Sequence, residues 1–304
     1  VQPLSELEVK AELLYNRIPF SKILFMINLS LGVLSFMLLL HNSLQRNTPS
    51  PKAKTISRTA GTIFSVALYL AFIFHLAGYC LRWYIGGRVP LSNGYETMQF
   101  MALCILLIAC LLHRRFSFIL PFGFLLSGFA LLVSYLGQMN PQITPLMPVL
   151  VSPWLSIHVS LIMMSYALLA FIMLNGILAL CLRKKESENN VSGNDAVQDN
   201  RIEQLTLVSR LLLYPATFFL GAGIFLGAVW ANVSWGRYWA WDPKEVWALI
   251  TFLVYGVAFH SQSLRIFRKP LFFHIYMILA FLTVLMTYFG VNYVLGGMHS
   301  YANS

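Results

Sequence analysis

Long stretches without a charged residue constrain the fold of this chain most strongly. From Phe116 to Leu182 the sequence contains no Lys, Arg, Asp or Glu. Windows of the same kind, each with 23 uncharged residues, lie between Lys22 and Arg46 and between Arg58 and Arg82. A membrane-spanning helix needs roughly 20 predominantly apolar residues, which these windows supply. The sequence therefore predicts an all-α polytopic membrane protein.

The charge-free windows predict a bundle of about eight transmembrane helices. Besides the two windows above, they cover Glu96 to Arg114, two helices within 116–182, Arg210 to Arg237, Glu245 to Arg265, and the chain after Lys269. The stretch 116–182 is too long for one helix, and its segment from Gln138 to Pro153 has the polar and proline residues of a loop. A re-entrant segment among the eight would lower the count to seven.

Composition excludes several classes of soluble protein. The 304 residues are 58% hydrophobic and only 11% charged, which is incompatible with a soluble domain of this length. A net charge of +10 would suit nucleic acid, but the basic residues lie in short clusters between apolar runs, so we expect no nucleic-acid partner. The chain contains no CxxC pair and no CxxCH motif, so it is neither a redox dithiol protein nor itself a c-type cytochrome.

The distribution of Lys and Arg predicts the orientation in the membrane. One side receives fourteen basic residues, namely Arg46, Lys52, Lys54, Arg58, Arg114, Arg115, Arg183, Lys184, Lys185, Arg201, Arg210, Arg265, Arg268 and Lys269. The other side receives seven, which are Lys10, Arg17, Lys22, Arg82, Arg88, Arg237 and Lys244. The more basic side faces the cytoplasm in membrane proteins. Both termini, all seven tryptophans and the loops 82–96, 137–156 and 230–247 are therefore expected outside.

Two divisions of the chain follow from this pattern. Residues 1–21 form an outer N-terminal segment, and because the chain begins at Val1 without Met we expect it to continue an upstream partner region. Residues 22–304 form the membrane domain. Within that domain a cytoplasmic linker covers 183–204, and its polar part from Glu186 to Asn200 is expected to be flexible.

Tryptophans are concentrated in one loop. Five of the seven lie between Trp230 and Trp247, around the run from Trp235 to Glu245. An aromatic belt at the membrane surface explains scattered Trp and Tyr, but not this density or the charged residues between them. A loop of this kind can offer a flat, π-rich floor with charged edges, which matches a porphyrin with its two carboxylates.

The histidines differ in their expected depth. His158 and His299 lie at the outer ends of two helices, where two imidazoles could fill both axial positions of a haem iron; ordinary interfacial histidines are the alternative. His260 lies fifteen residues beyond Glu245, or roughly 22 Å at about 1.5 Å per residue, which places it within the hydrocarbon region. A helix–helix hydrogen bond is the alternative there, and for His75 both readings stay open. His41, His113 and His274 are expected to be solvated helix caps.

Four motifs together resemble a known family. Trp-Gly-x-x-Trp-x-Trp-Asp-x-x-Glu-x-Trp at 235–247 resembles the tryptophan-rich, or WWD, signature of haem-handling membrane proteins. Residues 88–96, 152–159 and 289–302 resemble its first outer loop and the two segments that carry external haem ligands. Together they are similar to the CcsA (ResC) family of System II cytochrome c synthases, over residues from about Ala60 to the C-terminus.

The resemblance implies a function and a set of site residues. Haem b enters as substrate at an inner site, moves outward, and is presented at the WWD loop, where thiols of a CxxCH apocytochrome c add to its vinyl groups. His158 and His299 would be the outer axial ligands and act in catalysis, and His260 an inner ligand. The cofactor-binding set adds Trp235, Trp239, Trp241, Asp242, Trp247, Arg88, Arg237 and Lys244. Propionate partners from the outer interhelical loops must come from Arg82, Arg88, Arg237 and Lys244.

The resemblance also implies partners and a location. The partner subunit would be CcsB, which in some members is fused upstream, and the chain would lie among lipids of the bacterial inner membrane. Together the two would form a cytochrome c synthase. Two other functions stay open from the residues alone: haem delivery in the System I route, by a protein of the CcmC or CcmF kind, and electron transfer by a b-type membrane cytochrome.

The charged residues of the loop carry a local prediction. Asp242, Pro243 and Glu245 have the spacing of a helix start, with Asp as the N-cap, Pro at the first position and Glu at the third. Because haem propionates are anionic, Asp242 and Glu245 are expected to accept hydrogen bonds from backbone amides or a nearby Arg instead of contacting haem.

Overall fold

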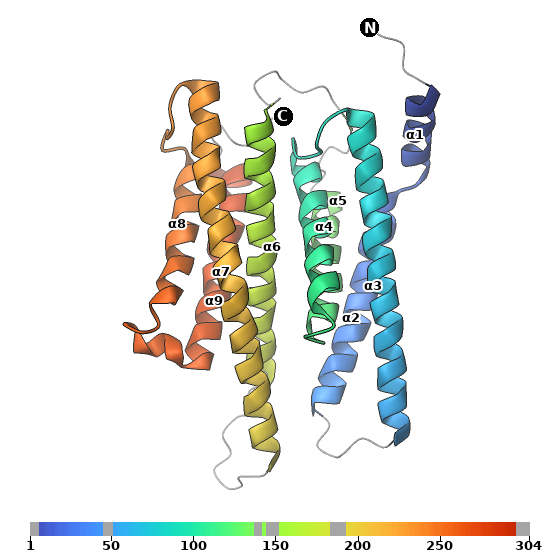
Figure 1. Cartoon of the computed structure of the whole chain (residues 1–304), viewed down its shortest axis with the longest axis vertical. Helices are drawn as coiled ribbons and strands as arrows, with labels where there is room; N and C mark the ends of the chain where they lie inside the picture. Colours follow the sequence, from blue (N-terminus) through green and yellow to red (C-terminus); the bar gives the residue numbers. More distant parts are fainter. Residues whose placement is uncertain (1–5, 45–50, 137–141, 144–151, 183–192, 296–304) are drawn as a thin grey trace. The chain divides into compact units, whose positions relative to one another are not determined.

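A computed structural model describes residues 6–44, 51–136, 142–143, 152–182 and 193–295. In these ranges every regular element is helical, which confirms the predicted all-α class (Figure 1). The chain divides into two compact units, Val1–Val151 and Ser152–Ser304. The predicted division at residue 22, between an outer N-terminal segment (1–21) and a membrane domain (22–304), stays a prediction.

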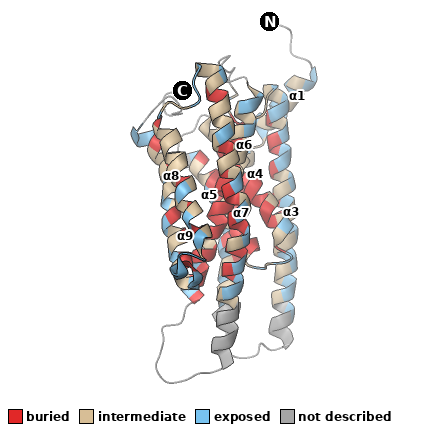
Figure 2. Cartoon of the chain, turned by 60° about the vertical axis from the view of Figure 1, so that its left-hand side comes forward, coloured by how far each residue is buried: buried red, intermediate tan, exposed pale blue. Residues whose placement is uncertain are grey.

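The described residues of the first unit form five helices: α1 (Glu6–Arg17), α2 (Phe20–Leu44), α3 (Pro51–Gly86), α4 (Gly94–Leu112) and α5 (Ile119–Leu136). Helix α4 packs against both α3 and α5, and 61% of its most apolar stretch is buried, against 28% for α3. Figure 2 shows the same contrast, because much of α3 is coloured as intermediate or exposed. Helix α4 is therefore the core helix of this unit.

Small and polar residues fasten α2 to α5. Asn28 donates a hydrogen bond from Nδ2 to Ser127 Oγ at 3.0 Å, and both side chains are fully buried. Next to Ser127, Gly128 faces the backbone of Leu29 so closely that a Cβ there would lie 2.9 Å from the Leu29 nitrogen. Small residues allow membrane helices to approach in this way, where van der Waals contact and interhelical hydrogen bonds replace the hydrophobic effect.

The second unit is built on α6. It contains α6 (Pro153–Leu182), α7 (Gly193–Trp235), α8 (Pro243–Val257), η2 (Ala258–His260), η3 (Arg265–Arg268), α9 (Pro270–Leu285) and η4 (Met286–Leu295). Helix α6 packs against α7 and α9 and is again 61% buried over its most apolar stretch. Ser165 of α6 donates a hydrogen bond to the Ala216 carbonyl of α7 at 2.8 Å, which ties the two helices in mid-span.

Helix α7 begins earlier than the sequence indicated. It is already helical at Gly193, so the second half of the stretch from Glu186 to Asn200, which was expected to be flexible, is helical. Residues 183–192 lie outside the described part. At about 1.5 Å per residue its 43 residues extend over roughly 65 Å, about twice the thickness of a bilayer core. The prediction failed because a polar sequence does not distinguish a flexible linker from a helix that continues into water.

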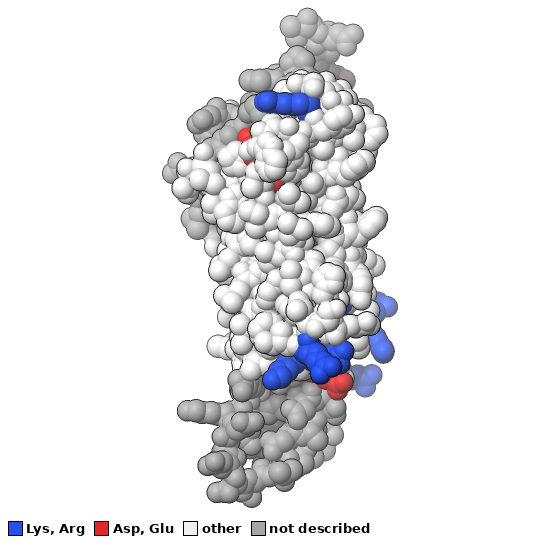
Figure 3. All heavy atoms as spheres, turned by 90° about the vertical axis from the view of Figure 1, so that its left-hand side faces the viewer, with Lys and Arg blue, Asp and Glu red and all other residues white. Residues whose placement is uncertain are grey.

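The eight predicted spans correspond to helices α2 to α9. Among the described residues, six helical segments are long and apolar enough to cross a membrane, while α5 and α8 are shorter. The face on the α8 side carries Lys and Arg toward its two ends and no charge in the band between them (Figure 3). The chain is accordingly an integral membrane protein, in which the uncharged band meets lipid.

The last helix changes its winding near its end. Helix α9 continues from Leu285 into η4, a π-helix. Gly290 lies in η4, and the Met286 thioether occupies the place where a Cβ of residue 290 would be. The missing side chain therefore lets Met286 fold against the wider helix. Such π-turns are rare and occur often at functional sites.

Two histidines expected to be solvated caps are buried. His113 is 8% exposed and makes bonds from its ring to carbonyls of its own helix, at Ala109 and Cys110. His274 is fully buried, and its Nε2 lies 2.9 Å from the Thr206 hydroxyl of α7. His113 does cap the C-terminus of α4, as expected, but neither ring is solvated. Basic neighbours along the chain do not reveal helices packed around a side chain. His41 is exposed, as expected.

Candidate functional site: an aromatic loop, a seated histidine and a buried arginine pair

The loop between α7 and α8 begins where α7 turns sharply. Gly236 has φ of +73°, a left-handed conformation that residues with a Cβ rarely adopt, and it follows Trp235 directly. Trp235 packs edge-on against Trp230 with ring centroids 4.8 Å apart. Trp230 is buried, so this pair anchors the end of α7 and starts the loop at a fixed point.

Helix α8 begins with the predicted capping box. Asp242 accepts a hydrogen bond from the Lys244 backbone amide at 3.1 Å, and Pro243 occupies the first helical position. The Glu245 carboxylate reaches back to the Asp242 amide at 3.2 Å. The prediction that both acids accept hydrogen bonds from backbone amides is confirmed, and each satisfies donors that a helix N-terminus otherwise leaves unpaired.

Glu245 also holds the residue before the cap in an unusual conformation. Its Oε2 atom accepts from the Ala240 amide at 2.9 Å as well as from the Asp242 amide, so both bonds flank Trp241. Trp241 has φ of +58°, and among the described residues it alone combines a Cβ with a positive φ. This conformation costs roughly 1–2 kcal/mol for an L-residue, and the carboxylate bonds help to hold it.

The side chain of the strained residue, Trp241, is exposed. Trp241 is 75% exposed, and neighbouring Tyr238 is exposed too. The Trp239 ring meets Trp241 edge-on, with centroids 6.2 Å apart and planes at 88°. Trp239 and Trp247 are half-buried. The loop thus presents exposed aromatic side chains next to a capped helix start. That they form a floor for a porphyrin stays a prediction.

Lys244 connects the loop to the end of the last helix. Its Nζ atom donates to Asn292 Oδ1 of η4 at 2.8 Å. Burial lowers the pKa of Lys244 to about 8, while the nearby Asp242 carboxylate opposes this shift. Lys244 therefore has a structural partner in η4. Arg237, in the same loop, is exposed.

His158 lies in the first turns of α6 with its ring against α7. Its Nδ1 atom lies 2.6 Å from the Gly223 carbonyl oxygen. Because a carbonyl only accepts, Nδ1 must carry the proton, and in the neutral ring the lone pair is then on Nε2. A histidine that ligates a metal ordinarily has its other nitrogen bonded in this way.

The other candidate histidines lie elsewhere or outside the described residues. His299 belongs to the segment 296–304, which is not described. His260 is not within a spanning helix as predicted: α8 ends at Val257, and His260 is exposed in the turn η2. The charge-free window that suggested a longer helix contains Gly256 and the run Ser261–Ser263, which favour a turn. His75 is buried and donates from Nε2 to the Gln99 carbonyl at 2.8 Å, a bond between α3 and α4.

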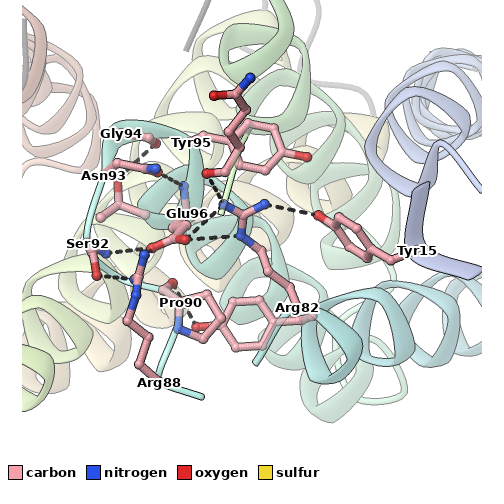
Figure 4. Close-up of polar contacts among 12 residues, drawn as sticks. Tyr15, Arg82, Arg88, Pro90, Ser92, Asn93, Gly94, Tyr95 and Glu96 are labelled. Carbon is pink, nitrogen blue, oxygen red and sulfur yellow. Dashed lines mark hydrogen bonds and ion pairs between the residues drawn. The ribbon is translucent and has the colours of Figure 1, made fainter. Parts of the chain in front are cut away.

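The first unit contains a polar centre around Glu96 that the sequence reasoning missed (Figure 4). Arg82 donates to Glu96 Oε1 from Nε at 3.1 Å and from a terminal nitrogen at 2.9 Å, and both side chains are at most 2% exposed. Arg88 contacts the other carboxylate oxygen at 3.0 Å and also binds Ser92. Arg82 further bonds the Tyr15 hydroxyl of α1 at 3.2 Å.

These contacts change the interpretation of the basic residues. Arg82 and Arg88, two of four candidates for a propionate, are both ion-paired with Glu96 within the first unit. The sequence did contain a local signal, because Asn93 followed by Glu96 has the spacing of a capping box. Indeed Asn93 accepts from the Glu96 amide at 2.8 Å, and Glu96 accepts from the Ser92 amide at 2.8 Å.

Known proteins resemble this chain over most of its length. It is 36% identical to Protein NrfI of Wolinella succinogenes over 302 residues, which is 98% of this chain and 32% of NrfI. It is 38% identical to the cytochrome c biogenesis protein CcsA of Chlamydomonas reinhardtii over 232 residues, 73% of this chain and 63% of that protein. The chain thus spans about a third of the first relative and less than two thirds of the second.

A third relative and a family match agree with these. CcsA of Guillardia theta is 34% identical over 241 residues, covering 72% of this chain and 79% of that protein. Residues 91–299, more than two thirds of the chain, match the family described as Cytochrome C assembly protein. The matched range begins in the α3–α4 loop beside Glu96 and includes the aromatic loop and His158. The chain belongs to the cytochrome c assembly protein family, as a CcsA-type membrane protein of cytochrome c biogenesis.

Proposed function

We propose that this chain transports haem across the membrane and presents it at the loop 235–242 for covalent attachment to apocytochrome c. Haem b is the substrate, and a CxxCH apocytochrome c is the acceptor. The loop faces the outer side of the bacterial inner membrane, as the excess of Lys and Arg on the opposite side favours. The partner is a CcsB subunit, with which the chain forms a cytochrome c synthase.

One observation carries this proposal. A single compact unit holds an exposed, rigidly based aromatic loop and a histidine whose Nδ1 proton is bonded to the Gly223 carbonyl. The flat face of Trp241 suits the apolar porphyrin, and the Nδ1 bond of His158 places the lone pair of the neutral ring on Nε2, the atom that would ligate iron. His299 is the proposed second axial ligand, on the strength of its motif.

The chemistry requires orientation more than a reactive side chain. A cysteine thiol of the acceptor adds across a haem vinyl group: a carbon–sulfur bond forms at one vinyl carbon, the thiol proton ends on the other, and nothing is oxidised or reduced. Two histidine ligands would hold the disc by its iron and leave the vinyl edge accessible. The protein supplies binding and orientation while the haem supplies the reactive group.

His260 is proposed as an inner ligand. His260 lies just beyond the C-terminal end of α8, whereas the aromatic loop precedes its N-terminal end. This place suits an earlier binding site for the same haem. His260→Ala should reduce haem at both stations if haem moves inward to outward. A His260→Ala protein that carries a full outer haem complement without added imidazole would contradict this role.

The test of the outer site uses covalent haem on a reporter cytochrome. The chain is co-expressed with a CcsB partner and a CxxCH reporter in cells that lack their own maturation route, and haem staining after denaturing electrophoresis measures attachment. His158→Gly and His299→Gly should each impair attachment, and added imidazole should partly restore it. His41→Gly, which changes an exposed histidine on another helix, is the control.

The outcomes separate the proposal from its alternatives. Normal attachment in both single variants would contradict the ligand assignment. Covalent haem in the reporter only when the chain is present supports a synthase, whereas a b-type electron carrier would keep haem without ever transferring it. Attachment that is lost in the variants and returns with imidazole assigns the defect to an open axial position.

A further inference from the structure

The His158 ring packs against α7 at two glycines, Gly223 and Gly227. We call this contact the seat of His158. A Cβ at residue 227 would lie 2.7 Å from both Cε1 and Nδ1 of the His158 ring and 3.3 Å from Nε2. Atoms this close overlap, so no residue larger than glycine fits opposite the ring in its present position. One turn earlier, Gly223 supplies the carbonyl that accepts the Nδ1 proton at 2.6 Å.

The two glycines have different neighbours. A Cβ at residue 223 would lie 2.7 Å from Cδ1 of Ile162, one turn beyond His158 on α6, and does not meet the imidazole among its nearest atoms. Together the glycines form a small-residue stripe that lets α6 and α7 approach closely. The Gly223 carbonyl bonds the ring, whereas Gly227 is the glycine whose Cβ would overlap it. A third glycine of α7, Gly221, packs against Phe252 of α8, so close packing of α7 and the seating of His158 can be separated by mutation.

The seat fixes three properties of the ring. The Gly223 carbonyl fixes which nitrogen carries the proton, and hence that Nε2 holds the lone pair in the neutral ring. The same bond fixes the rotation of the ring about its own axis, because Nδ1 must point at that carbonyl. The absence of a Cβ at residue 227 fixes how deeply the ring lies against α7.

We propose that Gly227, together with the Gly223 carbonyl, is a positioning element that presents Nε2 of His158 to haem iron. This inference rests on the proposed function, in which His158 is an axial ligand. Gly227 itself touches no substrate and acts through His158. A ring displaced from the seat would lose the Gly223 bond and, with it, its fixed tautomer and orientation.

The first experiment tests the seat without haem. Melting temperatures of the detergent-solubilised full chain are measured for Gly227→Ala, His158→Ala and the double variant. If the added methyl group clashes with the ring, Gly227→Ala lowers the melting temperature in the His158 background but much less when His158 is already alanine. Equal losses in both backgrounds would overturn the proposed contact. This comparison also works if the single variant is poorly stable.

The second experiment tests positioning through the haem spectrum. Gly227→Ala should lower haem retention on the order of ten-fold, as loss of a supporting contact around a metal ligand does. The remaining haem should lose its low-spin absorption, and imidazole should restore it. Gly221→Ala is the matched control, because on the same helix its Cβ would lie 3.0 Å from the Phe252 ring of α8 and has no atom of His158 among its nearest neighbours. Gly256→Ala, whose Cβ would meet nothing within 4 Å, gives the baseline.

Each outcome decides one question. Equal haem loss in Gly221→Ala and Gly227→Ala would mean that close packing of α7 alone matters and would overturn the positioning role. A normal spectrum in Gly227→Ala together with haem loss in His158→Gly would also overturn it, while leaving the proposed function intact. A normal spectrum in His158→Gly would instead contradict the proposed function. Loss confined to Gly227→Ala and reversed by imidazole supports positioning.

Discussion

Helices α4 and α8 begin alike, and their surroundings differ. Asn93 caps α4 and Asp242 caps α8, and in each case a glutamate three residues later reaches back to the amides before the helix. Glu96 is then enclosed by Arg82 and Arg88 in a buried centre of the first unit. Among the described residues Glu245 has no ion pair, and both of its bonds go to loop amides beside Trp241.

The same local hydrogen-bond pattern at a helix start serves two purposes in this chain. At α4 the glutamate closes a loop over a fully buried ion pair, and the loop becomes part of the core. At α8 the equivalent glutamate bonds hold a strained, exposed tryptophan in place. The first arrangement stabilises a fold, whereas the second holds in place the aromatic surface at which we propose that haem binds.

The largest expected effect lies at Glu96. Glu96→Ala leaves Arg82 buried without its carboxylate, and breaking a buried ion pair in this way costs roughly 3–5 kcal/mol. Glu245→Ala, at the equivalent position of α8, removes two amide bonds and no charge partner, so about 1–3 kcal/mol is expected. The midpoint of thermal unfolding and the yield of folded protein in detergent measure both. Equal losses in the two variants would contradict the contrast.

Much of the structure of these two regions could be predicted from sequence. The rest depends on contacts between residues that lie far apart in the chain. The helices and the Asp242 cap follow from apolar runs and from residues within four positions of each other. The bonds from Arg82 to Tyr15 and from His158 to Gly223 join residues 67 and 65 positions apart, which no local pattern reports. Which side of α7 would receive His158 depended on where the glycines of α7 met α6.

Helix ends were the weakest part of the sequence reasoning. Counting charges placed His260 inside a span, because Gly256 and Ser261 carry no charge and yet favour a turn. The same counting missed that Glu96 and Arg82, both charged, are buried together. A charge-free window identifies where a membrane can be crossed, and it does not locate the last helical residue or exclude a neutralised pair at the helix end.

The next effect in size concerns the cap of α8. Asp242→Ala removes the acceptor of the Lys244 amide and should lower stability by about 0.5–2 kcal/mol. Asp242→Asn keeps an acceptor oxygen and should cost less. Thermal unfolding measures the difference, and the fluorescence of the loop tryptophans should shift more in the alanine variant. An asparagine variant as unstable as the alanine variant would mean that charge, not capping, is what matters.

A smaller effect of opposite sign is expected at Trp241. Trp241→Gly relieves roughly 1–2 kcal/mol of left-handed strain and loses about 0.5–1 kcal/mol to the greater freedom of glycine in the unfolded chain. We therefore expect a net gain in stability of roughly 0.5–1 kcal/mol together with a loss of haem binding. Trp241→Ala keeps the Cβ and should show the binding loss without the gain. A destabilised glycine variant would argue that the indole, despite its exposure, contributes packing.

The smallest expected effect on stability concerns the second helical residue of α4 and of α8. At α4 this residue is Tyr95, which bonds Ser21 at 2.6 Å and lies under the Arg82 guanidinium. At α8 it is Lys244, whose pKa is lowered to about 8 by burial, ahead of the apolar part of the helix. The unfolded chain, with an ordinary lysine pKa, binds the proton more strongly than the folded chain. Stability must therefore rise with pH above about 7, and the rise ends near the unfolded pKa.

For one group the gain between pH 7 and pH 8 is on the order of 0.5 kcal/mol. Lys244→Met removes the titrating amine and its bond to Asn292, so its melting temperature should lack this alkaline rise while other groups titrate as before. The decisive quantity is the difference in melting temperature between the two proteins as a function of pH. A flat difference from pH 7 to pH 9 would mean that Lys244 stays charged throughout, held by Asn292 and the neighbouring Asp242 carboxylate, and that the start of α8 is as fully compensated as that of α4.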